Sequence, residues 1–239
     1  MPRFFIDPAD IGATHIQLDP ETLAHIRVLR LGPKESFIVS DGTGLDYRCI
    51  LTGDTAEILD KRENRAEPRL CCTVYLAFTR GERMEYAIQK SVELGAAAIR
   101  LFPAERCVVR YDAKALPKKV ARFEKIALEA AKQSGRGVVP AITVLSDVKT
   151  AMEEATTADC PLFCYELETK NSLRAALTET PNPETVSLVI GPEGGFTEAE
   201  VALAQTAGLR PITLGQRILR AETAPVAALA AVLFWAEEM

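Results

Sequence analysis

The residues best suited to chemistry are gathered in two loops near the C-terminus. The first loop, Gly191-Pro-Glu-Gly-Gly195, follows an apolar run that ends at Ile190, and the second is Leu214-Gly-Gln-Arg-Ile-Leu-Arg-Ala-Glu222. Glycine lets the backbone approach a ligand closely, and loops at the carboxyl ends of strands form the binding sites of open α/β sheets. An ordinary strand-to-helix turn explains either loop alone, but two such loops in succession favour a binding site.

The familiar signatures of nucleotide binding and hydrolysis are missing. The sequence has no G-x-G-x-x-G and no G-x-x-x-x-G-K-[ST] loop, which are the usual phosphate-binding patterns. It has no G-x-S-x-G elbow, and His15 and His25 both lie near the N-terminus, so a serine–histidine–acid triad has no evident base. The remaining chemistry is a pocket that binds an adenine and its ribose largely through backbone groups. Arg217, Arg220 and Glu222 would add charge beside it, unless an Arg–Glu pair caps the last helix.

Composition sets further limits. The six cysteines are scattered without zinc-type spacing, so we expect no metal site. No secretory signal and no apolar run of membrane-spanning length is visible. We therefore expect a cytoplasmic protein with reduced thiols and no membrane partner.

The net charge of −5 conceals a basic segment. Residues 100–136 contain ten Lys or Arg and four acidic residues, which leaves a charge of −11 for the remainder. A basic segment in an acidic protein is typical of a phosphate-binding surface. The alternative for its most charged part, from Lys114 to Lys125, is a solvated helix face.

The pattern of residues 1–68 predicts a small β-barrel. Short apolar runs alternate with turns every eight to ten residues or so, and Asp19-Pro20 begins a helix that extends to about Arg30. Strands are expected at 35–40, 46–51 and 56–59. The charged run 60–68 is expected to be the linker that leaves the barrel.

From residue 69 onward, strands alternate with helices, which predicts an α/β domain with a mostly parallel sheet covered by helices. We expect strands at 72–78, 98–102, 138–144, 161–165, 186–190 and 212–214, and helices at 82–94, 117–134, from an Asn171 cap to about 178, and from a Thr197–Glu200 capping box. Gly95 should end the first of these helices. The last helix, 224–235, is apolar nearly all round, so it is either deeply packed or, as we favour, part of a subunit interface.

Motifs spread over the whole chain carry a resemblance to one family. Besides the two glycine loops, they are Pro2–Phe5, His25–Arg30, Gln89–Gly95, Glu105–Val109 and Glu129–Arg136. In this order they resemble the RsmE family of ribosomal RNA methyltransferases, within the knotted SPOUT superfamily. The sequence departs from the family at Pro33-Lys-Glu35, where the family usually has a glycine in the turn.

The resemblance implies both a fold and an activity. It implies a PUA-like β-barrel for RNA binding over residues 1–68, and a SPOUT α/β domain with a deep C-terminal trefoil knot over residues 69–239. The implied methyl donor is S-adenosyl-L-methionine, and the implied acceptor is N3 of one uridine in 16S (small-subunit) ribosomal RNA, on the assembled 30S subunit. A homodimer with its cofactor pockets near the interface is also implied, and no metal is required.

The positions of individual residues in the two loops and in the matched motifs suggest their roles. Glu193 and Glu222 are candidates for accepting the uracil proton, and Arg220 for stabilising the uracil oxygens; alternatively, Glu193 only fixes its loop through backbone hydrogen bonds. The expected RNA-binding residues are Arg3, Arg27, Arg30, Arg106 and Arg136. The expected cofactor-binding residues are Tyr165, Glu166, Leu188, Ile190, Gly191, Gly194, Gly195, Leu214, Gly215, Ile218, Leu219, Arg220 and Thr223.

Three other functions stay open on the sequence. Another SPOUT activity, 2′-O-methylation of ribose, uses the same kind of fold. A non-catalytic RNA-binding module would explain the barrel and the basic segment. A phosphate-loop nucleotide binder would explain the glycines, although the loop lacks the lysine that such binders place after them.

Overall fold

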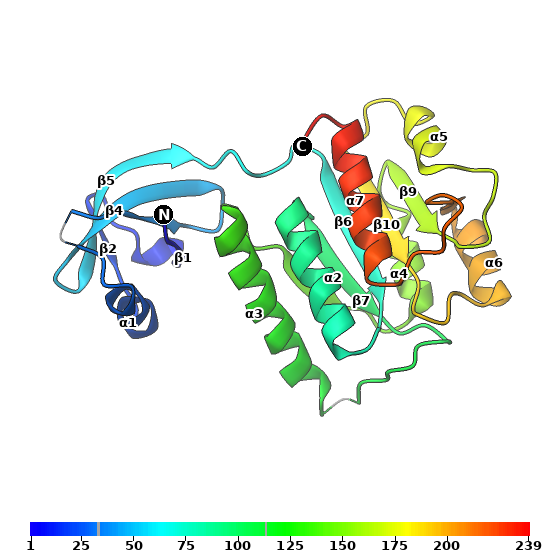
Figure 1. Cartoon of the computed structure of the whole chain (residues 1–239), viewed down its shortest axis with the longest axis horizontal. Coiled ribbons are helices and arrows are strands. Elements are labelled where there is room, and N and C mark those ends of the chain that lie inside the picture. Colours follow the sequence, from blue (N-terminus) through cyan, green and yellow to red (C-terminus); the bar gives the residue numbers. More distant parts are fainter. Residues whose placement is uncertain (33, 113) are drawn as a thin grey trace. The chain divides into compact units, whose positions relative to one another are not determined.

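The computed structural model describes residues 1–32, 34–112 and 114–239 (Figure 1). Pro33, where the sequence departs from the family it resembles, lies outside the described residues. The chain divides into two compact units, Met1–Glu67 with Leu128–Val139, and Pro68–Ala127 with Pro140–Met239. The predicted domain limits, 1–68 and 69–239, stay a prediction. The first compact unit ends its N-terminal part at Glu67 and also includes residues 128–139.

The first unit is built on a five-stranded sheet. Its strands are β1 (Arg3–Phe5), β2 (His15–Gln17), β3 (Phe37–Ser40), β4 (Leu45–Thr52) and β5 (Thr55–Glu63), in the order β1-β3-β4-β5-β2. β1 pairs with β3 in parallel, and the other pairs are antiparallel. Buried side chains on these strands, such as Phe4, Ile16 and Phe37, form its core together with Ile26 of the helix α1 (Pro20–Val28).

Local sequence signals in this unit predict the start of its helix correctly but not the end of its last strand. The helix α1 (Pro20–Val28) begins as predicted, with Asp19 Oδ1 accepting from the N–H groups of Glu21 and Thr22, both at 2.9 Å. A short 3₁₀ turn at Pro8–Asp10 precedes it. The prediction of a linker from residue 60 is wrong, because β5 continues to Glu63, where it pairs with Leu45 of β4. The charged residues 60–63 are therefore exposed side chains of a paired strand.

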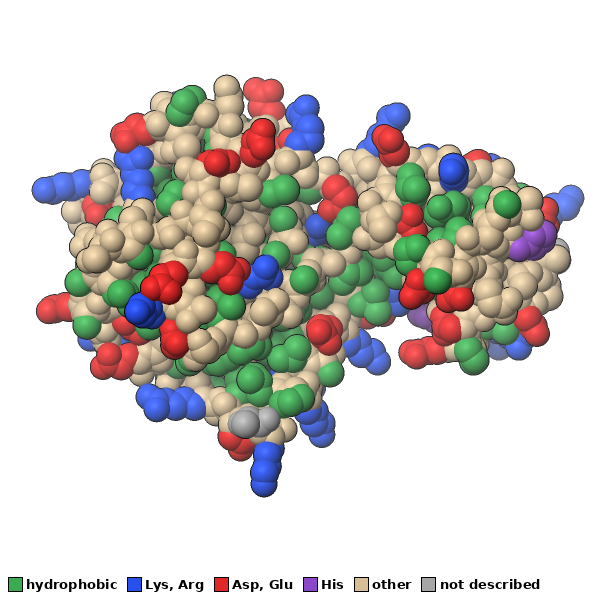
Figure 2. All heavy atoms as spheres, turned by 180° about the vertical axis from the view of Figure 1, so that it is seen from behind, with side chains coloured by type: hydrophobic (Ala, Val, Ile, Leu, Met, Phe, Trp, Pro, Cys, Tyr) green, Lys and Arg blue, Asp and Glu red, His purple; other side chains and the backbone are tan. Residues whose placement is uncertain are grey.

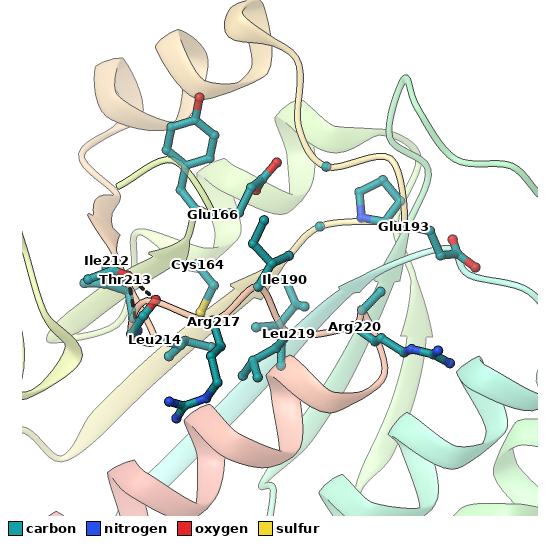
Figure 3. A pocket seen from close by; sticks show the side chains of 18 of the residues that line it. Cys164, Glu166, Ile190, Glu193, Ile212, Thr213, Leu214, Arg217, Leu219 and Arg220 are labelled. Atoms are coloured by element: carbon teal, nitrogen blue, oxygen red, sulfur yellow. Dashed lines mark hydrogen bonds between the residues drawn. The ribbon is translucent and has the colours of Figure 1, made fainter. Parts of the chain in front are cut away.

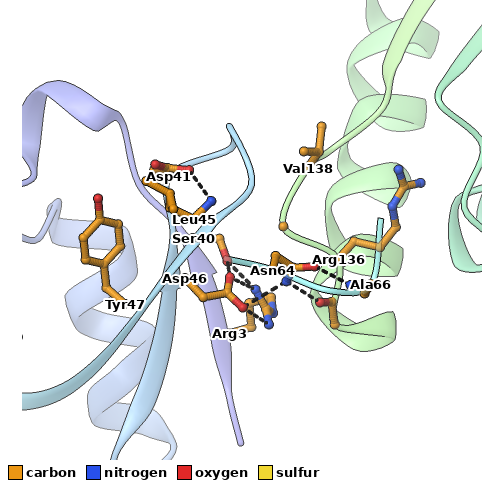
Figure 4. A network of polar contacts seen from close by, with 12 residues as sticks. Arg3, Ser40, Asp41, Leu45, Asp46, Tyr47, Asn64, Ala66, Arg136 and Val138 are labelled. Carbon is orange, nitrogen blue, oxygen red and sulfur yellow. Dashed lines mark hydrogen bonds and ion pairs between the residues drawn. The ribbon is translucent and has the colours of Figure 1, made fainter. Parts of the chain in front are cut away.

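A buried polar network centres on Asp46 (Figure 4). Arg3 forms an ion pair with Asp46, in which Nη2 donates to Oδ2 at 2.9 Å. Ser40 Oγ donates to Asp46 Oδ1 at 2.7 Å. Asn64 Nδ2 donates both to Asp46 Oδ2 at 2.9 Å and to the Gly135 carbonyl at 3.0 Å. The network therefore joins three strands and the segment after α3 (Leu116–Ser134) through a single carboxylate.

The second unit is built on a six-stranded sheet in which every pair is parallel. Its strands are β6 (Cys71–Ala77), β7 (Ala98–Phe102), β8 (Ala141–Val144), β9 (Cys160–Cys164), β10 (Thr185–Ile190) and β11 (Arg210–Ile212), in the order β11-β9-β10-β6-β7-β8. The helices of the chain from Gly81 onward are α2 (Gly81–Leu94), α3 (Leu116–Ser134), α4 (Val148–Ala155), α5 (Leu173–Thr178), α6 (Glu198–Ala207) and α7 (Thr223–Trp235). The prediction of an α/β fold with a parallel sheet is confirmed.

Helices cover both faces of this sheet. α2 and α7 lie side by side on one face, and α4 packs against β6, β7 and β10 from the other (Figure 1). The buried face of α2 is the predicted one, from Met84 to Val92, and Gly95 ends the helix in the left-handed conformation at φ 103°. α7 buries Leu229 and Leu233, whereas its Phe234 side chain stays 75% exposed. None of the helices in the described part of the chain is long and apolar enough to cross a membrane.

Several elements differ from the prediction. α4 was not predicted, although Asp147 caps it by accepting from the Thr150 N–H at 2.8 Å. The cap of α5 is Ser172 and not Asn171, because the Asn171 carbonyl accepts from the Thr213 N–H at 2.8 Å. β11 ends at Ile212, where its partner β9 also ends. The last two differences depend on contacts between segments far apart in the sequence.

The Asp46 network makes the stability of the protein depend on pH. Burial alone would raise the pKa of Asp46, but hydrogen bonds from Arg3, Ser40 and Asn64 outweigh it and lower the pKa overall. A carboxyl group with a lowered pKa stabilises the fold above its unfolded pKa of about 3.9, and this contribution is lost as the pH falls through the folded-state pKa. We expect Asp46→Asn to cost about 3 kcal/mol at neutral pH and to flatten the acid dependence below about pH 4. Urea unfolding across this pH range measures both effects.

Asp54→Asn is the matched control. Asp54 pairs with Arg27 at 2.7 Å, but its side chain is 71% exposed, so the loss should stay below about 1 kcal/mol. Equal losses in the two variants would contradict the role of Asp46.

Candidate active site

A cavity of about 590 Å³ opens in the second unit, where β9, β10 and β11 end. Three loops line it, at residues 164–166, 190–195 and 212–221. β9 pairs in parallel with both β10 and β11, so the carboxyl ends of the three strands lie at one edge of the sheet. The loops therefore meet although they are far apart in the sequence, as is typical of binding sites in open α/β sheets.

Most of the predicted cofactor-binding residues line this cavity. They are Tyr165, Glu166, Ile190, Gly191, Gly194, Gly195, Leu214, Gly215, Ile218, Leu219 and Arg220. Two others do not: Leu188 is fully buried within β10, and Thr223 is the exposed first residue of α7. Among the proposed catalytic residues, Glu193 and Arg220 line the cavity and Glu222 does not.

The cavity has two chemically different parts (Figure 3). Glu193 and Arg220 lie together at one end, whereas Ile190 and Leu219 form an apolar middle. Cys164 is also in the lining, but burial raises the pKa of its thiol to about 12. A thiol with such a pKa is neutral at physiological pH and is a poor nucleophile. No group of three or more His, Cys, Asp or Glu suited to a metal ion occurs in the described ranges.

The glycine loop is fixed by packing as well as by its own turn. A Cβ on Gly191 would lie 2.8 Å from the Phe196 ring, and one on Gly194 would lie 2.9 Å from Arg106 Cβ. Phe196 cannot retreat, because it is buried and packs on Phe163 with ring centroids 4.5 Å apart. Gly195 adopts φ +67°, a left-handed conformation that favours glycine. The glycines therefore let the loop backbone pack directly against Phe196 and Arg106.

The helix after this loop begins as predicted. Thr197 and Glu200 form a capping box at the start of α6. Glu200 is buried, and its Oε1 also accepts from the Glu105 N–H at 2.8 Å. This bond ties the loop after β7 to the glycine loop.

Three of the predicted RNA-binding arginines have internal partners. Arg106 Nη1 donates to the carbonyls of Gly194 and Phe196, both at 3.3 Å, so it braces the glycine loop. Arg136 is 3% exposed and pairs with Glu67 at 2.6 Å. Arg3 pairs with Asp46 as described above. In this fold these three arginines therefore pair with carboxylates or donate to backbone carbonyl groups of the same chain.

The other two RNA-binding candidates are exposed. Arg27 makes a solvent-exposed pair with Asp54, and Arg30 lies just after α1 at φ 51°. Basic and acidic side chains are interspersed over the face shown in Figure 2.

Arg83 lies at the charged end of the cavity and was not predicted. Its Nη1 is 3.4 Å from Glu193 Oε1, and its Nε is 3.8 Å from Glu222 Oε1. The Arg80 N–H also donates to Glu193 Oε1, at 3.1 Å. The signal that could have identified this segment is its place directly after β6, which pairs in parallel with β10.

Comparison with known proteins gives the class of the chain. Residues 66–233 match the family described as RNA methyltransferase domain, and the chain therefore belongs to this family of RNA methyltransferases. It is 32% identical over 226 residues to ribosomal RNA small subunit methyltransferase E of Mesomycoplasma hyopneumoniae, covering 95% of this chain and 96% of the relative. It is 34% identical over 254 residues to the protein of the same name from Bacillus subtilis, covering 99% and 98%.

Solved structures of similar proteins have the same fold as this chain. Ribosomal RNA small subunit methyltransferase E from Neisseria gonorrhoeae, bound to S-adenosyl methionine, has a TM-score of 0.88 at 33% identity, covering 98% of each chain. A protein from Legionella pneumophila in complex with the cofactor S-adenosylmethionine has a TM-score of 0.85 at 29% identity, covering 98% of this chain and 97% of that one. Within the RNA methyltransferases, the chain belongs to the ribosomal RNA small subunit methyltransferase E family, and the resemblance drawn from its motifs is confirmed.

The packing of the glycine loop leads to a stability prediction. Gly191→Ala should cost about 2 kcal/mol, because its methyl group would press on the immobile Phe196 ring. Gly81→Ala is the matched control, since a Cβ there has no neighbouring atom within 4 Å; it should change stability by less than about 0.5 kcal/mol. Denaturant unfolding measures both, and equal effects would contradict the role assigned to Phe196.

Proposed function

We propose that this chain transfers a methyl group from S-adenosylmethionine to N3 of one uridine in 16S ribosomal RNA, with the assembled small subunit as substrate. The observation that carries the proposal is the cavity formed by three loops at the carboxyl edge of the sheet. The chain's family membership and the S-adenosyl methionine bound to the Neisseria gonorrhoeae relative support the cofactor.

The residues of the cavity fit this cofactor. Its volume of about 590 Å³ lies in the range usual for ligands of this size. Ile190 and Leu219 offer apolar walls for an adenine, and the backbone of Gly191–Gly195 and Leu214–Leu219 offers polar groups for its edges. The exposed Glu166 side chain lies beside the loop, with Oε1 2.1 Å from where a Cβ on Gly195 would be, and it is the proposed acceptor for ribose hydroxyls.

The reaction needs a nitrogen lone pair at N3, where neutral uracil carries a proton. S-adenosylmethionine supplies an electrophilic methyl group on a sulfonium when bound. Glu193 is the better placed proton acceptor, because it lines the cavity and its Oε2 has no donor among the described residues. Arg220, whose side chain is 77% exposed, can turn toward the uracil oxygens and stabilise the negative charge left after deprotonation. Glu222 lies 4.0 Å from Arg220 and would orient it.

The proposed function includes a type of fold for each domain and a location in the cell. We propose that residues 1–68 form a PUA-like barrel for RNA, that residues 69–239 form a SPOUT domain with a trefoil knot, and that the protein acts in the cytoplasm. The proposed RNA contacts are Arg27, Arg30 and the exposed part of the Arg106 side chain.

A homodimer through α7 is part of the same proposal. Phe234 leaves a large apolar side chain 75% exposed on a helix without charged residues, which favours a protein partner. Light scattering should give the mass of a dimer, and Phe234→Asp should yield a monomer. A monomeric wild-type protein would contradict this part.

Product analysis tests the reaction itself. Small subunits from a strain that lacks this methylation are incubated with the protein and labelled cofactor, and the ribosomal RNA is then digested and analysed by mass spectrometry. N3-methyluridine at one position is expected. A ribose methyl group would favour the alternative SPOUT activity, and absence of both product and cofactor binding in calorimetry would favour an RNA-binding module. Magnesium-dependent triphosphate binding would favour a nucleotide binder.

Removing the proposed base should affect chemistry and leave cofactor binding intact. Glu193→Gln keeps the shape of the side chain but cannot accept the proton as a carboxylate, so the single-turnover rate should fall at least about 100-fold. Its affinity for S-adenosylmethionine should stay within about threefold of the wild type. Glu198→Gln, an exposed position in the first turn of α6, is the control. A parallel loss of cofactor affinity and stability would instead assign Glu193 to loop fixation.

A further inference from the structure

Arg83 joins the two loops that carry the proposed catalytic groups. It lies in the first turn of α2, and its guanidinium reaches Glu193 in the glycine loop at 3.4 Å and Glu222 before α7 at 3.8 Å. One cation therefore contacts carboxylates from two loops that are distant in the sequence.

Both carboxylates are only half paired. Each glutamate side chain is 15% exposed, and Oε2 of each is buried without a hydrogen-bond partner among the residues that the structure describes. A carboxylate withdrawn from water is costly unless a cation compensates it. Arg83 compensates both, whereas Arg220 approaches only Glu222, at 4.0 Å. Without Arg83, two negative charges would face one another across the space that its guanidinium fills.

The support of this cation is rigid. α2 buries Met84 and Ile88 and packs against α7, so Arg83 extends from a helix fixed within the core. Glu193 is tied to the start of the same helix by the Arg80 N–H at 3.1 Å. The helix therefore fixes the position from which the Arg83 side chain, itself 42% exposed, reaches between the glycine loop and the loop that carries Arg220.

We propose that Arg83 is a positioning residue for methyl transfer, which shields Glu193 from Glu222 and thereby holds the two loops at their working separation. This rests on the proposed function, since it adds a requirement to the same site. It follows that the loss caused by removing Arg83 arises from repulsion between the two carboxylates, and that neutralising Glu222 should relieve it.

A double-mutant cycle tests the shielding. Arg83→Gln, Glu222→Gln and the double variant are compared with the wild type in single-turnover methylation of small subunits. We expect Arg83→Gln to slow methylation about 30-fold in the wild-type background but at most about sixfold in the Glu222→Gln background, because the repelling charge is gone there. Comparing the two backgrounds cancels whatever Glu222→Gln itself costs through Arg220. Equal losses in the two backgrounds would overturn the proposal and indicate that Arg83 contacts RNA or cofactor directly. An Arg83→Gln protein with the wild-type rate would also overturn it.

Two further variants keep the test decisive. Arg69→Gln is the matched control, because Arg69 is exposed and pairs with a single carboxylate, Glu238, at 3.0 Å; its rate should stay within about twofold of the wild type. If Arg83→Gln does not fold, the same cycle is made with Arg83→Met, which removes the charge but keeps an unbranched, adaptable side chain at this position. Since the cycle is scored on whichever methylated product the wild type forms, a different modified atom would overturn the proposed function and leave this test intact.

Discussion

The parallel pairing of β10 with β6 and β9 is the constraint on which the site depends. Ile190, the last residue of β10, is in register with Leu76 of β6 and Cys164 of β9. β9 and β10 therefore end together and β6 ends one residue later, and the loops after them must share one edge of the sheet. A shift of one residue in this register would turn the alternating side chains of β10 to the opposite faces and displace the glycine loop. Core packing and site geometry are thus set by the same hydrogen bonds.

The conformation of the glycine loop, residues 191–195, is fixed by contacts within the protein. Gly191 and Gly194 are needed because Phe196 and Arg106 occupy the space where their side chains would be. The capping box at the start of α6 and the bond from Glu105 to Glu200 fix the other end of the loop. The walls of the cavity are therefore held by the protein before any ligand arrives, which reduces the ordering cost of binding.

Arginine in this protein is used inside the fold as much as on its surface. Arg3 and Arg136 neutralise Asp46 and Glu67 within the first unit, and Arg106 satisfies carbonyl groups. A basic segment in a sequence does not reveal which guanidinium groups are already paired. The charge pattern of residues 100–136 therefore predicted RNA contacts at positions whose charges are partly used internally.

The sequence by itself determined the features that depend on neighbours along the chain. The buried face of α2, its end at Gly95, the Asp19 cap and the Thr197–Glu200 capping box were all predicted, because their physical causes lie within a few residues. The family and the two glycine loops followed from motifs for the same reason. Only the tertiary structure decided the end of β5, the Ser172 cap, and the meeting of Arg83 with Glu193 and Glu222. Each of these depends on strand pairing and charge contacts between distant segments, and neither propensity nor periodicity encodes such contacts.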